Sequence, residues 1–410
     1  MKTRISIALS ILSTAAILFF TLRPGATWVT HGWSFDLWAG DTALADLIAN
    51  LLLFLPLGLS LTLAGVRPWR VVALGALLSC TVEFLQQWIP GRDPSVGDIL
   101  CNTISTALGA LLVARAPAWL FVSHRRSAWQ ARLTAIVAVL VWYGTGAMVR
   151  HTLPPMPYHI VTTPDFEHYG LYDGRIVSIT PGLGSLEVTA VAAPSPPGQT
   201  SPLFAVLDRQ GVKVIMLSVD GADLTLRYSM PALQATLEQP DLRLRGALRG
   251  VAPGDTFIAK TWHDSTNVCL RVNATERCHL GYTIGDGWKL IYYPQGRPAW
   301  MLGLLNMLWI AGGVIGVGYW GARSGGEKDG GENNGGEGRR GGGGLAIGIV
   351  IAGILLVPLL TGLKATPITE WIGALAGMGV GYLIGLGLFD TRAPQAAGYT
   401  TPPSHPGQTS

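Results

Sequence analysis

The sequence predicts a polytopic α-helical membrane protein of about eight spans with an extracytoplasmic all-β sandwich or jelly-roll domain. Hydrophobic residues make up 49% of the 410 residues and charged residues only 13%, against about 25% charged residues in a typical globular domain. Eight stretches are long and apolar enough to cross a bilayer, which takes about 20 residues. Residues 151–298 hold no such stretch and alternate instead in short, strand-like runs.

The composition also excludes several classes of protein. The 29 Lys and Arg residues against 25 Asp and Glu residues give a net charge of only +4, too weak and too dispersed for a nucleic-acid partner. Four cysteines without a Cys-x-x-Cys pair exclude a disulfide-rich scaffold and a structural zinc site. We therefore expect no metal and no cofactor, and a lipid bilayer as the main partner.

The eight expected spans are residues 5–22, 44–65, 69–88, 97–115, 131–149, 299–320, 345–363 and 369–389. The first, preceded by Lys2 and Arg4, could instead be a signal peptide. No small-x-small cleavage site follows it. The sequence therefore favours an uncleaved amino-terminal anchor.

The basic residues predict the orientation of the spans, because Lys and Arg gather in cytoplasmic loops. They concentrate at the amino terminus and in alternate short loops: Lys2, Arg4, Arg67, Arg70, Arg115, Arg125, Arg126, Arg132, Arg323, Lys328, Arg339 and Arg340. This pattern places both termini in the cytoplasm and residues 152–297 on the outer side. We expect a multi-pass membrane protein, with the β domain periplasmic or extracellular.

Four parts follow along the chain. Residues 1–150 form a membrane domain of about five helices, residues 151–298 the sandwich, and residues 299–390 three more membrane helices. Within the last part, residues 321–344 are half glycine and predict a flexible cytoplasmic loop. Residues 391–410, rich in Pro, Gly, Ser and Thr, predict a disordered tail.

The β domain is predicted from alternating runs that turn signals separate. The runs are Ser185–Val191, Leu203–Asp208, Val212–Val219, Leu224–Tyr228, Leu242–Leu248, Phe257–His263, Val268–Val272 and Trp288–Tyr293. Cys269 and Cys278 flank an expected hairpin, and an oxidising outer compartment would let them pair. We therefore predict a disulfide between them.

Polar residues gather in the second to fourth spans, where ionisable side chains are costly and indicate function. Asp46 and Asn50 share one helix face, as do Glu83 and Gln86, and Asp98 and Asn102. With Arg92, these residues fall near the outer membrane interface or about one turn below it. We expect Asp46, Asn50, Gln86, Arg92, Asp98 and Asn102 to bind a substrate.

Each of these residues also has a structural interpretation. Asp46 and Asp98 could be acids that stabilise helix N-termini. Glu83 could form an ion pair with Arg92 or, with its pKa raised by burial, act as a general acid or base. Glu370, which opens the last span, could join the cluster or be an N-terminal helix acid. Along that span, Gly373, Gly377, Gly381 and Gly385 predict close helix packing.

The same polar positions resemble a known family. The pattern Asp46-x3-Asn50-x3-Phe54-x-Pro56-x-Gly58, followed by Glu83-x2-Gln86, Pro90-x-Arg92, Asp98-x3-Asn102 and Gly109, looks like the VanZ-like membrane family over residues 40–115. Ser105 stands where that family often has glycine. The family is named for glycopeptide (teicoplanin) resistance, so the resemblance implies a bacterial envelope protein and no particular reaction.

The β domain resembles laminin-G-like or concanavalin-like sandwiches in its pattern. The resemblance rests on Phe166-Glu167 with Gly170, the run Ser185–Val188 and the closing run Gly287–Leu290. Such sandwiches often bind glycans, although a fold alone does not establish a function.

These observations favour a membrane protein that recognises or processes a cell-surface or lipid-linked glycan, with Glu83 as the candidate acid or base. The alternative is a non-enzymatic scaffold or sensor that binds a glycan or a protein through the sandwich. A transporter is less favoured, because the polar residues lie on one side of the membrane rather than at its middle.

Overall fold

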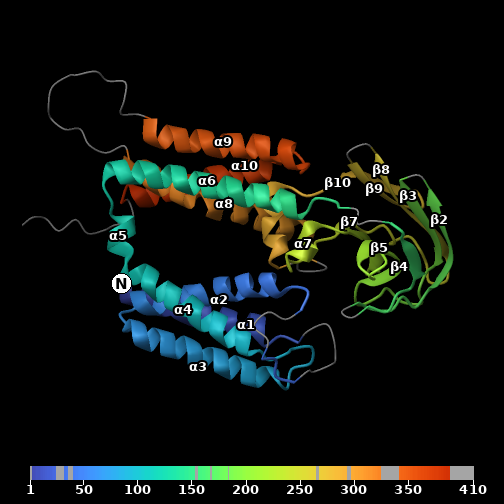
Figure 1. The fold of residues 1–410 in the computed structure, drawn as a ribbon, viewed down its shortest axis with the longest axis horizontal. Coiled ribbons are helices and arrows are strands. Elements are labelled where there is room, and N and C mark those ends of the chain that lie inside the picture. Colours follow the sequence, from blue (N-terminus) through green and yellow to red (C-terminus); the bar gives the residue numbers. More distant parts are fainter. Residues whose placement is uncertain are drawn as a thin grey trace, which may run out of the picture.

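The computed structural model describes residues 2–24, 32–35, 40–152, 156–166, 169–182, 184–264, 267–292, 297–324 and 341–387. Within them, eight helices are long and apolar enough to cross a membrane. Figure 1 shows these helices side by side, with the β domain at one end of the helix layer. The predicted fold class, a helical membrane part with a separate β part, is therefore confirmed in outline.

The eight long helices follow the expected spans within a few residues. They are α1 (Lys2–Thr21), α2 (Ala43–Leu63), α3 (Pro68–Gln86), α4 (Val96–Ala114), α6 (His124–Met148), α8 (Ala299–Ser324), α9 (Gly341–Thr361) and α10 (Ile368–Gly385). Two short helices, α5 (Ala116–Leu120) and α7 (Pro231–Gln234), were not expected. α8 and α9 extend into both ends of the predicted glycine-rich loop. The rest of that loop and the tail 391–410 lie outside the described residues.

The long helices form two groups (Figure 1). In the first group α1, α2, α3 and α4 pack together around a small core of Ile17, Phe54, Leu57 and Val82. In the second group α6, α8, α9 and α10 pack together, and their core is continuous with that of the β domain. The fifth predicted span, α6, therefore packs with the last three spans rather than with the first four.

Glycines allow close contact within both groups. A Cβ atom on Gly58 of α2 would lie 2.2 Å from the Thr106 carbonyl oxygen of α4. In α10, Cβ atoms on Gly377 and Gly381 would lie 2.2 and 2.0 Å from the Ala311 and Ile315 carbonyl oxygens of α8. The predicted use of the α10 glycines in helix packing is thus confirmed, because only glycine leaves room for the backbones at these distances.

The β domain consists of two five-stranded antiparallel sheets that pack face to face. The strands are β1 (His159–Thr162), β2 (Arg175–Gly182), β3 (Ser185–Val191), β4 (Ser201–Leu207), β5 (Lys213–Asp220), β6 (Asp223–Tyr228), β7 (Leu242–Leu244), β8 (Thr256–Asp264), β9 (Asn267–Val272) and β10 (Thr275–Leu280). One sheet has the order β1-β4-β5-β6-β7 and the other β10-β9-β8-β3-β2. Alternate side chains from both sheets fill the space between them.

Seven predicted runs correspond to β3 through β9, and the eighth is wrong. The first residues of the expected strand Trp288–Tyr293 are instead the end of a 3₁₀ helix, η1 (Ile284–Leu290), and Tyr293 lies outside the described residues. Thr283 and Asp286 form a capping box at its start. Trp288 donates a hydrogen bond from Nε1 to Asn306 of α8 at 2.8 Å, which draws the segment onto the second helix group.

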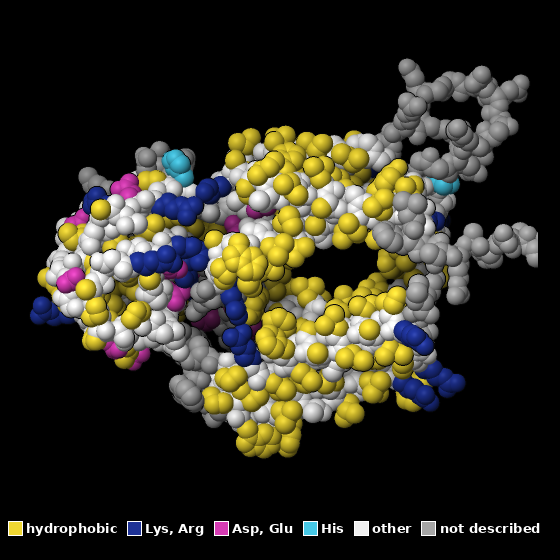
Figure 2. Space-filling model, turned by 180° about the vertical axis from the view of Figure 1, so that it is seen from behind, with side chains coloured by type: hydrophobic (Ala, Val, Ile, Leu, Met, Phe, Trp, Pro, Cys, Tyr) yellow, Lys and Arg dark blue, Asp and Glu magenta, His cyan; other side chains and the backbone are white. Residues whose placement is uncertain are grey.

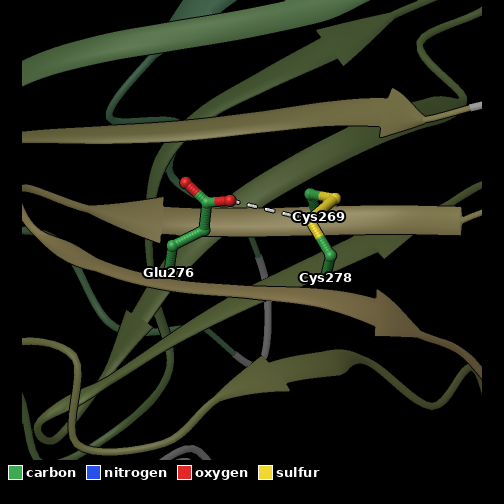
Figure 3. Close-up of a disulfide and its surroundings, with 3 residues drawn as sticks. All are labelled: Cys269, Glu276 and Cys278. Carbon is green, nitrogen blue, oxygen red and sulfur yellow. Dashed lines mark hydrogen bonds between the residues drawn. A yellow bond between two sulfur atoms is a disulfide. The ribbon is translucent and has the colours of Figure 1, made fainter.

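A disulfide joins neighbouring strands of the second sheet. The Sγ atoms of Cys269 in β9 and Cys278 in β10 are 1.98 Å apart. Figure 3 shows Glu276 beside the pair, with Oε1 3.8 Å from the Cys278 sulfur. Cys80 in α3 and Cys101 in α4 are free thiols.

Candidate functional site

The polar residues of the first helix group lie at the end of the helices that faces the β domain. Asp46 lies in the first turn of α2 and Asp98 in the first turn of α4. The Asn50 side chain donates a hydrogen bond from Nδ2 to Asp98 Oδ1 at 2.7 Å, which ties α2 to α4. Asp46 and Arg92 are both close enough to interact electrostatically with Asp98. The structure therefore brings Asp46, Asn50, Asp98 and Arg92 into one neighbourhood.

Glu83 contacts the start of α4. Glu83 is 2% exposed, and its Oε2 accepts a hydrogen bond from the Ser95 backbone N at 2.9 Å. Ser95 is the N-cap of α4, where backbone N–H groups lack helical partners and the helix dipole favours an anion. Of the alternatives for Glu83, the ion pair with Arg92 is not formed in the described part of the chain.

Arg92 and Gln86 bind the end of α1 instead. The Arg92 guanidinium donates to the carbonyl oxygens of Phe20 and Arg23 at 2.9 and 2.8 Å. Gln86 donates from Nε2 to the Thr21 carbonyl at 2.9 Å. Carbonyls at a helix C-terminus have no partner within the helix, and a cation is favourable there. Both side chains therefore fix α1 against the loop between α3 and α4.

Asn102 lies deeper in the first group and apart from the aspartates. It is 1% exposed and donates from Nδ2 to Ser79 Oγ of α3 at 3.0 Å. Its Oδ1 is buried and has no hydrogen-bond partner in the part of the chain that the structure describes. One turn further, the Ser105 hydroxyl donates to the Leu51 carbonyl of α2, so Ser105 bridges α2 and α4.

The β domain completes the neighbourhood by capping α2. The Thr236 carbonyl accepts hydrogen bonds from the Leu44 and Ala45 backbone N atoms at 3.1 and 3.2 Å, and Thr236 Oγ1 also accepts from Leu44 N at 3.1 Å. Thr236 follows α7 and has a positive φ of 50°, which is costly for a β-branched residue. A strained residue thus holds the β domain one turn from Asp46.

Sequence reasoning missed one carboxylate of this neighbourhood, Glu238. Burial raises the pKa of Glu238 to about 6. The positive charge of the nearby Arg227 lowers this pKa, and the negative charge of Asp46 raises it further. Glu238 N also donates to the Leu290 carbonyl of η1 at 2.9 Å. Because Glu238 lies in a loop of the β domain and belongs to no motif, nothing in the sequence pointed to it.

Glu370 belongs to a different cluster. It is 0% exposed and receives hydrogen bonds from the Thr283 hydroxyl, the Gly285 backbone N and Asn306 Nδ2. Asn306 also donates to Asp286 at 2.9 Å. This cluster attaches η1 to α8 and α10, so it does not share a site with Asp46 and Asp98.

The space-filling view shows how the two helix groups face each other. Figure 2 shows an opening between the two helix groups, bordered mainly by hydrophobic side chains. Acidic and basic side chains lie at its end near the β domain. No group of His, Cys, Asp and Glu in the described residues could hold a metal ion. What the neighbourhood offers is carboxylate and amide oxygens, which accept hydrogen bonds.

Comparison with known families bears on the first helix group. The family model described as VanZ/LLP1 matches residues 5–120, which run from α1 to the end of α5. The resemblance expected for residues 40–115 is confirmed and extends to α1. With the eight apolar helices, it identifies a multi-pass membrane protein. Curated proteins and solved structures give no match to the chain.

Proposed function

We propose that this membrane protein acts in the bacterial envelope and recognises or processes a cell-surface or lipid-linked glycan. The site lies where α2 and α4 meet the β domain, in the outer half of the inner membrane, and both termini are cytoplasmic. The observation that carries the proposal is that Asp46, Asp98 and Glu238, which come from three separate segments, lie within electrostatic reach of one another through Asp46.

Carboxylates in this arrangement suit a polyhydroxylated ligand. Each ionised carboxylate accepts several hydrogen bonds, which matches the neighbouring hydroxyl groups of a sugar. Partly buried carboxylates also make stronger hydrogen bonds than exposed ones. Asn50 holds Asp98 in place through their 2.7 Å hydrogen bond. Arg92 supplies the positive charge near Asp98, and the opening beside the site admits the apolar part of a lipid-linked ligand.

Glu83 is the candidate acid or base of this site. It is buried, and its side chain lies at the first turn of α4, one turn from Asp98. Gln86 and Asn102 support the site from behind through their bonds to α1 and α3. The β domain, with its laminin-G-like or concanavalin-like pattern, would bind the part of the glycan that extends from the membrane.

The test is complementation of a deletion strain of the source organism, scored by envelope integrity and glycopeptide sensitivity. We expect Asp98→Asn and Glu83→Gln to reach wild-type membrane levels by immunoblot and to fail to restore the phenotype. Glu276→Gln, which changes an exposed carboxylate of β10, is the matched control and should restore it fully. Full restoration by Asp98→Asn would contradict a glycan site at this position.

The second candidate is a scaffold or sensor that binds its partner through the sandwich, with the spans as an anchor. The hydrogen bond from Ser95 N to Glu83 favours it, because it gives the buried carboxylate a purely structural task. A scaffold predicts that Glu83→Gln and Asp98→Asn both restore the phenotype, whereas substitutions on the exposed faces of the sheets abolish it.

A further inference from the structure

A cavity of ≈ 390 Å³ lies between the two sheets of the β domain. It falls within the usual range of roughly 300–1,000 Å³ for small-molecule sites. Both sheets line it: Val206, Val214 and Leu226 on one side, and Pro181, Leu186 and Trp262 on the other. Well-packed cores leave few voids of this size, because the lining atoms lose dispersion contacts.

Aromatic and polar groups gather at one end of the cavity. The rings of His151 and His263 stack with centroids 5.4 Å apart, and the Tyr228 ring meets His151 edge-on at 4.9 Å. The Nε2 atom of His151 is buried and has no hydrogen-bond partner among the described residues. Burial, with a smaller effect of His263, lowers the pKa of His151. A buried polar atom without a partner costs free energy unless a ligand satisfies it.

The same end of the cavity lies close to the membrane. His151 follows the last residue of α6, Met148, by three positions, a distance of at most about 10 Å along an extended chain. Thr152 N donates to the Ser229 carbonyl at 3.0 Å, and Tyr228 Oη donates to the Val149 carbonyl at 3.4 Å. These bonds fix the end of β6, and with it the cavity, against the end of the span.

We propose that this cavity binds the aliphatic chain of a lipid, whose head group forms a hydrogen bond with His151 Nε2. The lining of the cavity is mainly apolar, which suits a hydrocarbon chain better than the hydroxyl groups of a sugar. Its histidine end faces the region where lipid head groups lie. The site is separate from the one formed by Asp46, Asp98 and Glu238 and does not depend on it.

Photocrosslinking of the full-length protein in phosphatidylcholine nanodiscs tests the proposal. One arm adds palmitic acid that carries a diazirine in its chain, and the other builds the nanodisc with phosphatidylcholine that carries the diazirine in an acyl chain. We expect labelled peptides from β3, β5 and β6, and competition by unlabelled palmitic acid. Labelling in the first arm alone would identify a free fatty acid as the ligand. Labelling in both arms would identify membrane lipid.

A cavity-filling variant gives the decisive comparison. Ile215→Trp places a larger side chain at the cavity wall, whereas Ile258→Trp makes the same change at a position that is 40% exposed and does not line the cavity. We expect about tenfold less labelling of Ile215→Trp. Keeping two methylene groups of the lipid chain out of the cavity would weaken binding by about this factor. The second variant should label like the wild type.

Two results would overturn the proposal. One is labelling confined to the spans, with none on the strands that line the cavity. The other is equal labelling of Ile215→Trp and the wild type, with both showing a cooperative thermal transition. If Ile215→Trp does not fold, Val206→Phe replaces it. Competition by unlabelled palmitic acid in the wild type tests binding in the cavity without any variant.

Discussion

The Glu83 carboxylate of α3 accepts a hydrogen bond from the Ser95 backbone N, the N-cap of α4, at 2.9 Å. A buried acid in the last turn of a helix is unfavourable beside its own C-terminus, where the dipole is negative. The neighbouring helix offers the opposite end of its dipole and unpaired N–H groups. The bond therefore joins two helix ends that otherwise would each leave polar groups unsatisfied.

This bond predicts different outcomes for two substitutions of Glu83. Glu83→Ala leaves the Ser95 backbone N–H without its acceptor and should lower stability by about 1–3 kcal/mol, the usual cost of a buried donor without a partner. Glu83→Gln keeps an acceptor oxygen and should lower stability much less. Thermal unfolding of the purified protein in detergent measures both, with Glu276→Ala as the control. An equal loss of stability in Glu83→Ala and Glu83→Gln would contradict a stabilising role for the acceptor oxygen.

Thr236 predicts a local effect at the contact between the β domain and α2. Thr236→Ala removes the Oγ1 acceptor of Leu44 N and keeps the carbonyl acceptor. We expect faster hydrogen exchange at the first amides of α2, since loss of a capping side chain costs about 0.5–2 kcal/mol. Mass spectrometry of exchanged peptides measures it. Thr225→Ala, within β6, should leave these amides unchanged, and unchanged exchange in Thr236→Ala would refute the cap.

The contact of α10 with α8 predicts a contrast between two glycines. Gly381→Ala would bring a Cβ atom 2.0 Å from the Ile315 carbonyl oxygen, whereas Gly379→Ala meets nothing within 4 Å. Overpacking of this kind typically costs about 1–3 kcal/mol. We expect a lower midpoint of thermal unfolding for Gly381→Ala and no decrease for Gly379→Ala. Equal midpoints would mean that the two helices separate easily.

Glu238 predicts a pH dependence of stability. Its pKa is raised from 4.5 to about 6 in the folded protein, mainly by burial. Between these two values the folded state binds more protons than the unfolded state, so this residue makes stability fall as pH rises. Above about pH 6 both states are ionised and the penalty is constant. Glu238→Gln removes the penalty.

The measurement is the unfolding midpoint of Glu238→Gln minus that of the wild type, from pH 4.5 to 7.5. We expect the difference to grow with pH up to about 6 and then to stay level. Glu276→Gln, which changes an exposed carboxylate of β10, is the control variant. If the difference in midpoint between Glu238→Gln and the wild type does not change with pH, the pKa of Glu238 in the wild type is the same in the folded and unfolded states.

Parts of the candidate site were predictable and parts were not. Asp98 lies in the first turn of α4 and Asn50 about two turns into α2, on helices that open at the same side, and the structure joins them by a hydrogen bond. The partner of Glu83 was not predictable, because the sequence offered Arg92 as the nearest opposite charge and not a backbone N–H group. Glu238 was missed because a loop after a short helix has no periodicity to mark it.

The sequence by itself determined the number and approximate limits of the spans, seven strands of the β domain and the resemblance to VanZ-like proteins. Apolar length and alternation are local properties, since the bilayer and the pleat of a sheet act on every residue in turn. Only the tertiary structure decided that α6 joins the last three spans, that η1 is helical and that Thr236 and Glu238 meet α2. These outcomes depend on partners far along the chain, and no local pattern identifies such partners.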